Sequence, residues 1–152
     1  MSKINKINIA VVGATGYTGL DLTLLLSKHP LVNIKYLCAT KKIGKSISFF
    51  DKRIKKKLPI ISTLNNIRWK DVDLVFLSLP NGEAQKLIYK YYYKFDKLKF
   101  IDLSADFRIT NLKKYEKNYN LKHKAKKLIH KSLYSIPELE RKKINKFRIN
   151  AN

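Results

Sequence analysis

The sequence is poor in acidic residues, glycine, proline and cysteine. It has 11 Asp and Glu against 33 Lys and Arg, with five glycines, four prolines and one cysteine in 152 residues. A single cysteine excludes an intrachain disulfide and fits a reducing compartment. No apolar run approaches the roughly 20 residues that a membrane-spanning helix needs. The length and the 45% hydrophobic content predict one domain over residues 1–152, with a core of its own.

The formal charge of +22 raises the question of nucleic-acid binding. The excess is almost entirely Lys, spread along the chain, whereas the residue that best reads base edges and phosphate forks is Arg. The same chain is rich in Ile, Asn, Tyr and Phe, so we interpret the lysines as compositional drift toward A/T-rich codons. Of the functions considered, a nucleic-acid binder ranks lowest. The first apolar segment begins at residue 7, which leaves no room for a signal peptide, and a cytoplasmic location is expected.

The strongest local signal lies in residues 7–29. An apolar, β-branched run is followed by three glycines at intervals of three, and then by a Leu-rich segment that stops before Pro30. This order predicts a buried strand, a tight turn and a helix. Gly13 allows the turn, Gly16 allows the backbone to approach a pyrophosphate, and Gly19 allows the helix to lie close to the strand. The motif predicts dinucleotide binding, with the phosphates on the amides of the first helical turn.

The next predicted strand, residues 32–39, indicates which dinucleotide. In NAD-binding folds a carboxylate at the end of this strand binds the ribose hydroxyls. Here no acidic residue lies between Asp21 and Asp51, and the strand leads into Thr40, Lys41 and Lys42. Ammonium groups attract a 2′-phosphate that a carboxylate would repel, so the sequence predicts NADP(H). The alternative is that Lys41 and Lys42 are two more lysines of a Lys-rich chain.

Further predicted strands cover residues 73–79, 99–104 and 147–151, and predicted helices cover 83–95, 112–119 and 122–131. Residues 134–139 are predicted to form a loop. The alternation of strands and helices predicts an α/β, Rossmann-like doubly wound fold with a mostly parallel sheet. The turn after residue 79 lies at the carboxyl end of a predicted central strand, where such sheets bind ligands.

Several polar residues were weighed as functional candidates. Cys38 sits in an apolar strand and is expected to be a buried hydrophobe rather than a nucleophile. Asp106 and Arg108 either pair with each other or face a ligand, and the structural pair is favoured. His123 and His130 are expected to face solvent, and their spacing predicts no metal site.

Four motifs together resemble one family, the N-acetyl-gamma-glutamyl-phosphate reductases of arginine biosynthesis. They are GATGYTG at 13–19, FLSLPNG at 76–82, DLSADFR at 102–108 and YSIPEL at 134–139. The first is shared with aspartate-semialdehyde dehydrogenases, and the last two are more specific. The resemblance implies reduction of an acyl phosphate to a semialdehyde by NADPH. A cysteine thioester carries the acyl group, and a His of a second domain serves as acid and base.

The resemblance assigns site residues to three groups. The pyrophosphate group comprises Gly13, Thr15, Gly16, Tyr17, Thr18 and Gly19. Thr40, Lys41 and Lys42 lie near the 2′-phosphate, and Pro80, Asn81 and Gly82 lie toward the nicotinamide, where the family commonly has His at the position of Asn81. Ser104, Asp106 and Arg108 belong to a loop on the substrate side. No metal is implied.

The family's nucleophile follows an Ala-Asn pair that matches Ala151 and Asn152, the last two residues. We therefore expect the cofactor-binding half of the enzyme, with no catalytic residue and no activity alone. A small acyl-phosphate substrate and a homo-oligomeric full-length enzyme are implied, without nucleic acid or membrane as partners. The alternatives are a related reductase of aspartyl or aminoadipyl phosphate, or a non-catalytic NADPH-binding module.

Overall fold

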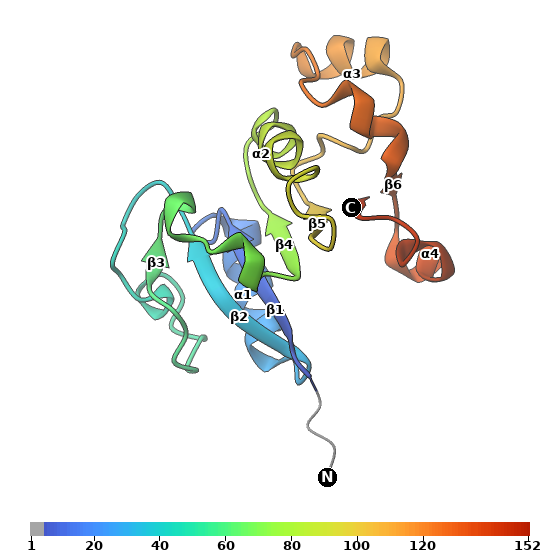
Figure 1. Ribbon diagram of the computed structural model, residues 1–152. Helices are drawn as coiled ribbons and strands as arrows, with labels where there is room; N and C mark the ends of the chain where they lie inside the picture. Colours follow the sequence, from blue (N-terminus) through green and yellow to red (C-terminus); the bar gives the residue numbers. More distant parts are fainter. Residues whose placement is uncertain (1–4) are drawn as a thin grey trace. The chain divides into compact units, whose positions relative to one another are not determined.

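The computed structural model describes residues 5–152, which form two compact units (Figure 1). The N-terminal unit runs to Ser78, and the C-terminal unit runs from Leu79 to Asn152.

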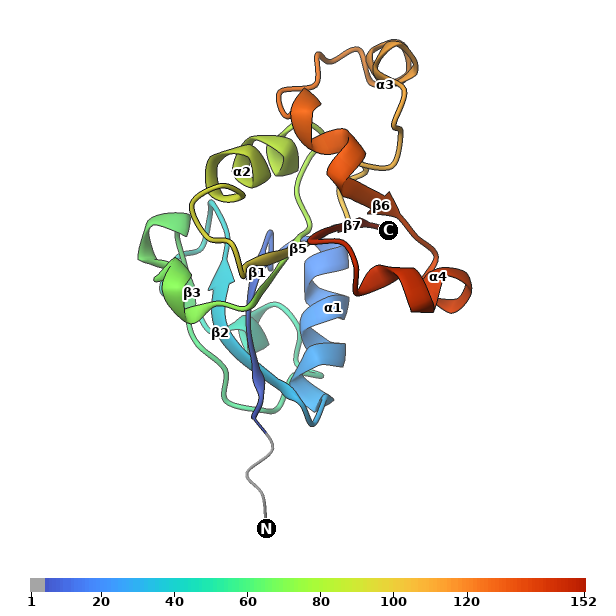
Figure 2. The same cartoon turned by 45° about the vertical axis from the view of Figure 1, so that its right-hand side comes forward.

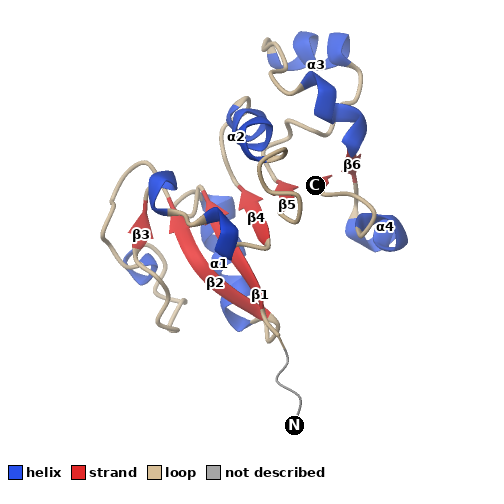
Figure 3. Cartoon of the chain, viewed as in Figure 1, coloured by secondary structure: helices blue, strands red, loops and turns tan. Residues whose placement is uncertain are grey.

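The N-terminal unit is built on parallel strands in the order β3-β2-β1-β4 (Figure 3). Its main elements are β1 (Ile7–Val12), α1 (Tyr17–Lys28), β2 (Val32–Cys38), β3 (Ile61–Ser62) and β4 (Leu74–Leu77). Three short 3-10 helices, at Ile47–Phe49, Leu64–Asn66 and Trp69–Asp71, lie between β2 and β4. Helix α1 contacts both β1 and β2, so these three elements form a β-α-β unit of parallel strands.

The core of this unit follows from its sequence pattern. Ile9, Ala10 and Val11 of β1 are fully buried, because β1 lies between β2 and β4 and is covered on its faces. Residues of β2 and of the segment that follows it complete the same apolar cluster, including Leu37, Ile47 and Ile54. Strand β3 lies at one end of the strand order and is an edge strand.

The C-terminal unit also contains parallel strands, with β7 between β5 and β6 (Figure 2). Its elements are α2 (Glu83–Tyr91), β5 (Lys99–Asp102), α3 (Leu112–Tyr119), a 3-10 helix (Lys126–Lys131), β6 (Ser132–Tyr134), α4 (Pro137–Ile144) and β7 (Ile149–Ala151). Phe100, Phe107 and Tyr115 are the largest fully buried side chains of this unit. The alternation of elements and the parallel pairing within each unit confirm the predicted α/β, Rossmann-like fold.

Some predicted boundaries are wrong. Residues 134–139 are not a loop: Tyr134 ends β6 and Pro137 begins α4, where its missing N–H costs nothing because a first-turn amide has no intrahelical partner. The helix predicted over 83–95 ends at Tyr91, and the one predicted over 122–131 is a 3-10 helix from Lys126. The strand predicted over 73–79 is shorter at both ends, and the strand predicted over 99–104 is shorter at its C-terminal end.

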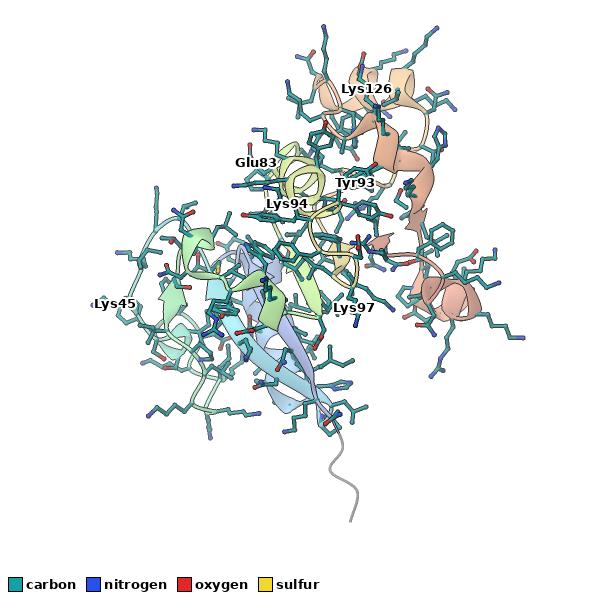
Figure 4. The ribbon with its side chains drawn as sticks, in the orientation of Figure 1. Lys45, Glu83, Tyr93, Lys94, Lys97 and Lys126 are labelled. Carbon is teal, nitrogen blue, oxygen red and sulfur yellow. The ribbon has the colours of Figure 1, made fainter. Side chains whose placement is uncertain are left out.

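Lysine side chains project from many elements. Figure 4 labels Lys45 in the N-terminal unit and Lys97 and Lys126 in the C-terminal unit, and all three are exposed. Within residues 5–152, no helix is both long enough and apolar enough to cross a membrane.

Candidate functional site

The first part of the site is the phosphate loop, residues 13–19, between β1 and α1. Gly13 has a φ of +85°, and a Cβ atom built on it would lie 1.9 Å from the carbonyl oxygen of Ser78. A Cβ atom on Gly19, in the first turn of α1, would lie 2.1 Å from the carbonyl oxygen of Gly13. Real Cβ atoms do not approach backbone so closely, so the turn and the close approach of α1 both require glycine. Both constraints agree with what the sequence predicts, a tight turn at Gly13 and a close approach of the helix at Gly19.

Gly16 differs from the other two glycines of the loop. Its φ and ψ are −76° and 163°, an extended conformation open to any residue, and the nearest atom to a built Cβ is 3.5 Å away. Packing within the chain therefore does not demand glycine here. An exposed glycine that the fold does not require is compatible with a ligand that approaches the backbone closely.

The N-cap residue of α1 provides no side-chain hydrogen bond to the first turn of the helix. Gly16 is that residue and has no side chain to offer, and the first turn of α1 contains no acidic residue. Tyr17 is 93% exposed, and Thr18 is also exposed. First-turn amides and the positive end of the helix dipole favour an anion. The phosphate loop thus fits the pyrophosphate of a dinucleotide, which the backbone amides of Tyr17 and Thr18 would hold, whereas the Gly16 N–H already donates to the Gly13 carbonyl oxygen over 3.1 Å.

The second part of the site follows β2. Thr40, Lys41 and Lys42 are exposed, and Lys42 has a left-handed φ of 60°. The two acidic residues closest in sequence are occupied elsewhere, because Arg53 lies 2.8 Å from both the Asp21 and the Asp51 carboxylates. These hydrogen bonds lower the pKa of Asp51. The Lys41 and Lys42 ammonium groups therefore have no unpaired carboxylate close to them in sequence that would repel a ligand phosphate.

Cys38, the last residue of β2, is 1% exposed, as predicted. Its Sγ atom lies 3.6 Å from the carbonyl oxygen of Thr63 and 3.8 Å from Oγ of Ser62. Burial raises the pKa of the Cys38 thiol. A buried, protonated thiol is a poor nucleophile.

In the C-terminal unit the structure brings together two of the predicted groups, the turn at 80–82 and the loop at 104–108. The Leu79 N–H donates to Oγ of Ser104 over 2.9 Å. The Gly82 N–H donates to Oδ1 of Asp106 over 2.8 Å, and the Gln85 N–H donates to Oδ2 over 3.0 Å. Pro80 and Asn81 are exposed beside these contacts.

The favoured ion pair between Asp106 and Arg108 is wrong. The Asp106 carboxylate accepts backbone amides and the hydroxyl of Tyr115, while Arg108 Nε donates to the carbonyl oxygen of Asn152 over 2.9 Å. A second nitrogen of Arg108 donates to the carbonyl oxygen of Leu103. The Asp106 carboxylate is fully buried beside α2, so it bonds to backbone amides there, while the Arg108 guanidinium bonds to backbone carbonyl oxygens elsewhere.

Asp102, at the end of β5, is a structural carboxylate that sequence reasoning missed. Its oxygens accept the N–H groups of Ser104 and Phe107 at 2.7 and 2.9 Å, so it shapes the loop in which Ala105 has a φ of 71°. Burial raises the pKa of Asp102 to about 6, against the opposing effect of these hydrogen bonds. Asp102 opens the DLSADFR motif, but the motif by itself does not show that its carboxylate holds the loop.

The prediction that His123 faces solvent is wrong. Its side chain is 1% exposed and lies edge-on to the rings of Phe107 and Tyr115, with centroids 5.1 and 4.9 Å away. Burial lowers the pKa of His123. His130 is exposed, as predicted. Among residues 5–152, no three His, Cys, Asp or Glu side chains form a group that could hold a metal ion.

Residues 8–147 match the family described as "Semialdehyde dehydrogenase, NAD binding domain". The chain belongs to this family. The match spans the phosphate loop, the end of β2 and the loop at 104–108, and so covers every part of the candidate site.

Among curated relatives of this NAD-binding domain is the N-acetyl-gamma-glutamyl-phosphate reductase of Ehrlichia ruminantium (strain Gardel), 40% identical over 149 residues. That alignment covers 96% of this chain and 42% of the relative. A probable chloroplastic N-acetyl-gamma-glutamyl-phosphate reductase of Arabidopsis thaliana is 37% identical, over 96% of this chain and 36% of the relative. These relatives confirm the resemblance found in the motifs, and the chain spans about two fifths of their length.

Solved structures agree with the fold. The aspartate semialdehyde dehydrogenase of Candida albicans, determined with NADP, is 25% identical with a TM-score of 0.52, over 68% of this chain and 31% of that one. The aspartate semialdehyde dehydrogenase II of Vibrio cholerae has a TM-score of 0.63 at 18% identity, over 97% of this chain and 38% of that one, and so supports the fold alone.

Proposed function

We propose that this NAD-binding domain is the NADP(H)-binding part of an N-acetyl-gamma-glutamyl-phosphate reductase. The whole enzyme would reduce N-acetyl-glutamyl phosphate to N-acetyl-glutamate semialdehyde and release phosphate, in arginine biosynthesis. The identity of 35–40% to reductases of that name over nearly the whole chain supports this reaction. A cytoplasmic location and a homo-oligomeric full-length enzyme belong to the same proposal.

The choice of NADP(H) rests on one observation, the exposed Thr40-Lys41-Lys42 segment after β2. The cofactor, when bound, supplies the hydride that reduces the acyl group. This chain's own contribution would be to bind and orient it: the amides of Tyr17 and Thr18 would hold the pyrophosphate beside Gly16, and Lys41 and Lys42 would hold the 2′-phosphate. The turn at 80–82 would then lie toward the nicotinamide.

A related reductase of aspartyl phosphate is the second candidate. The NADP-bound aspartate semialdehyde dehydrogenase of Candida albicans favours it, since that enzyme shares the fold. Its 25% identity is well below that of the curated reductases, so we place it second. The substrate pocket of either enzyme would be built by sequence that this chain does not contain.

The cofactor proposal is tested by a double substitution, Lys41→Gln with Lys42→Gln. The Kd values for NADPH and NADH are measured by fluorescence titration. Two exposed ion pairs of about 0.5–1 kcal/mol each correspond to a loss of roughly 10-fold in NADPH affinity, with NADH affinity unchanged.

The control is Lys52→Gln with Lys55→Gln, two exposed lysines of the same unit, which makes the same change in net charge. It should leave both Kd values within about twofold, as expected for charges remote from a ligand. Wild-type protein that binds NADH as tightly as NADPH would refute the NADP(H) proposal. Equal losses in the two double variants would assign the effect to net charge alone.

The reductase proposal has a separate test in the coding sequence that follows Asn152. Pro-Gly-Cys in frame would supply the nucleophile that the resemblance requires. A stop codon at that point would refute catalysis by this gene product and leave cofactor binding as its remaining activity.

A further inference from the structure

Helix α2 is capped by a carboxylate that comes from another part of the chain. Its N-cap residue, Gly82, has a φ of +90° and no side chain to accept a first-turn amide. Asp106, which follows β5, takes that role: its two carboxylate oxygens accept the N–H groups of Gly82 and Gln85. A carboxylate at a helix N-terminus satisfies free amides and complements the helix dipole.

This cap distinguishes the N-terminus of α2 from that of α1. The first turn of α1 has neither an acidic residue nor a side-chain cap, whereas α2 has the fully buried carboxylate of Asp106. A ligand anion is therefore favoured at α1 and repelled at α2. What α2 offers a ligand is instead the shape of the turn that precedes it, residues 80–82.

The Asp106 carboxylate is itself held from α3. The Tyr115 hydroxyl donates to Oδ1 of Asp106 over 2.8 Å, and Nε2 of Gln85 donates to the Tyr115 oxygen over 3.0 Å. Tyr115 is fully buried, so its hydroxyl has a fixed place. The carbonyl side of the Gln85 amide accepts the Lys124 N–H, which closes the network onto the segment after α3.

The backbone of Asp106 is held as well. Nδ1 of His123 lies 3.1 Å from the Ala125 nitrogen and can only accept that N–H, so the proton of the neutral ring is on Nε2. Nε2 of His123, 2.9 Å from the carbonyl oxygen of Asp106, is then the donor of that hydrogen bond. Asp106 is thus fixed at its side chain by Tyr115 and at its main chain by His123.

From this arrangement we infer that Asp106 is a positioning residue for the nicotinamide half of the cofactor. It acts by holding the Pro80-Asn81-Gly82 turn in the conformation that receives that half, with Tyr115 and His123 as its supports. The inference rests on the proposed function, because the placement of this turn beside the nicotinamide comes from the resemblance. It adds a role that the four sequence motifs do not assign.

The test is Asp106→Asn, which keeps the size of the side chain and replaces one accepting oxygen by an NH₂ group. Binding of NADPH is compared with binding of adenosine 2′,5′-bisphosphate, which lacks the nicotinamide half. We expect NADPH affinity to fall at least about 10-fold, the scale of one lost charge-assisted hydrogen bond. The affinity for the bisphosphate should stay within about twofold, since its contacts would be those of the phosphate loop and Lys41–Lys42.

Amide hydrogen exchange adds a readout that does not depend on ligand. In Asp106→Asn, exchange at Gly82 or at Gln85 should rise at least about 10-fold, because one of the two accepting oxygens is replaced by a donor. Tyr115→Phe removes one support while keeping the ring, and should move both readouts in the same direction by a smaller amount. This milder variant keeps the test decisive if Asp106→Asn does not fold.

The matched control is Ile149→Ala, a fully buried residue of β7 in the same unit, whose strand partners are Phe100 and Ser132. It should lower the unfolding midpoint without separating NADPH from the bisphosphate. An equal loss of both ligands in Asp106→Asn, an equal NADPH loss in Ile149→Ala, or exchange that is unchanged at both Gly82 and Gln85 would overturn the inference. Failure of the proposed function looks different: the wild-type protein would bind neither ligand, and the inference would fall with it.

Discussion

Gly13 and Ser78 meet at the carboxyl ends of neighbouring strands, with no room for a side chain between them. A Cβ atom on Gly13 would lie 1.9 Å from the Ser78 carbonyl oxygen and 2.8 Å from its carbonyl carbon. The close contact places the start of the phosphate loop directly beside the end of β4. Gly16, three residues on, has no such neighbour, so the two glycines are expected to fail in different ways when they are replaced.

Gly13→Ala should destabilise the fold, and Gly16→Ala should spare it. The left-handed φ and the clash at Gly13 predict a loss of on the order of 2 kcal/mol or more in the free energy of unfolding. At Gly16 the extended conformation suits alanine, but Gly16 is the N-cap of α1, where alanine is less favourable than glycine, so the loss of stability should stay within about 1 kcal/mol. The new methyl group should block the pyrophosphate and weaken NADPH binding at least about 10-fold.

Urea denaturation and NADPH titration of both variants make this comparison. We expect Gly13→Ala to lose more stability and Gly16→Ala to lose more NADPH affinity for its loss of stability. This opposite ranking separates a direct effect on the ligand from a general loss of fold. If Gly16→Ala bound NADPH like the wild type, the assignment of the phosphate loop would be wrong.

His123 predicts a pH dependence of stability. Burial lowers its pKa in the folded state, against the smaller raising effects of the Asp106 hydrogen bond and charge, whereas the unfolded chain has the ordinary value near 6.5. Below that pH, His123 binds a proton in the unfolded state but stays neutral in the folded state until a lower pH is reached. The His123 contribution to stability is therefore present above about pH 6.5 and is lost progressively as the pH falls.

His123→Gln should remove this dependence, and His130→Gln, at an exposed position, should retain it. Free energies of unfolding are measured in urea at several pH values from 5 to 8. Burial raises the pKa of Asp102 to about 6, so protonation of Asp102 increases the stability of the folded state as the pH falls below that value. Because this effect opposes that of His123 and is present in both variants, the quantity to compare is the difference in unfolding free energy between the two variants. A difference that is constant over this range would contradict the prediction.

Cys38 should be inert in the folded protein. It is 1% exposed, burial raises its thiol pKa, and reaction with a disulfide reagent requires an accessible thiolate. As the chain has one cysteine, reagent uptake reports on this site alone. We expect labelling at least about 100-fold slower than for a small free thiol, and fast, stoichiometric labelling in urea. Stoichiometric labelling within seconds under native conditions would show that β2 opens readily.

Much of the architecture could be predicted from the sequence, because local patterns carried it. The apolar run before Gly13, the helix after it, and α3 at residues 112–119 all agree with the structure. Asn111 caps α3 by accepting the Lys114 N–H, a local contact of the kind that sequence patterns report. Boundaries failed where a distant group sets the end of an element.

Helix α2 is the clearest example of such a failure. Arg148 lies 50 or more residues away, and its guanidinium donates to the carbonyl oxygens of Tyr92, Phe95 and Leu98. It also lies 4.1 Å from the centre of the Tyr92 ring. These contacts stabilise a non-helical course after Tyr91, although the local sequence would continue the helix to residue 95.

The sequence by itself determined the parallel α/β class, the phosphate loop and the charge at the end of β2, because each depends on residues adjacent along the chain. Only the tertiary structure decided that Asp106 caps α2 instead of pairing with Arg108, and that His123 is buried and neutral. Those outcomes depend on which side chains from distant segments enclose a group, and burial sets both its partners and its protonation.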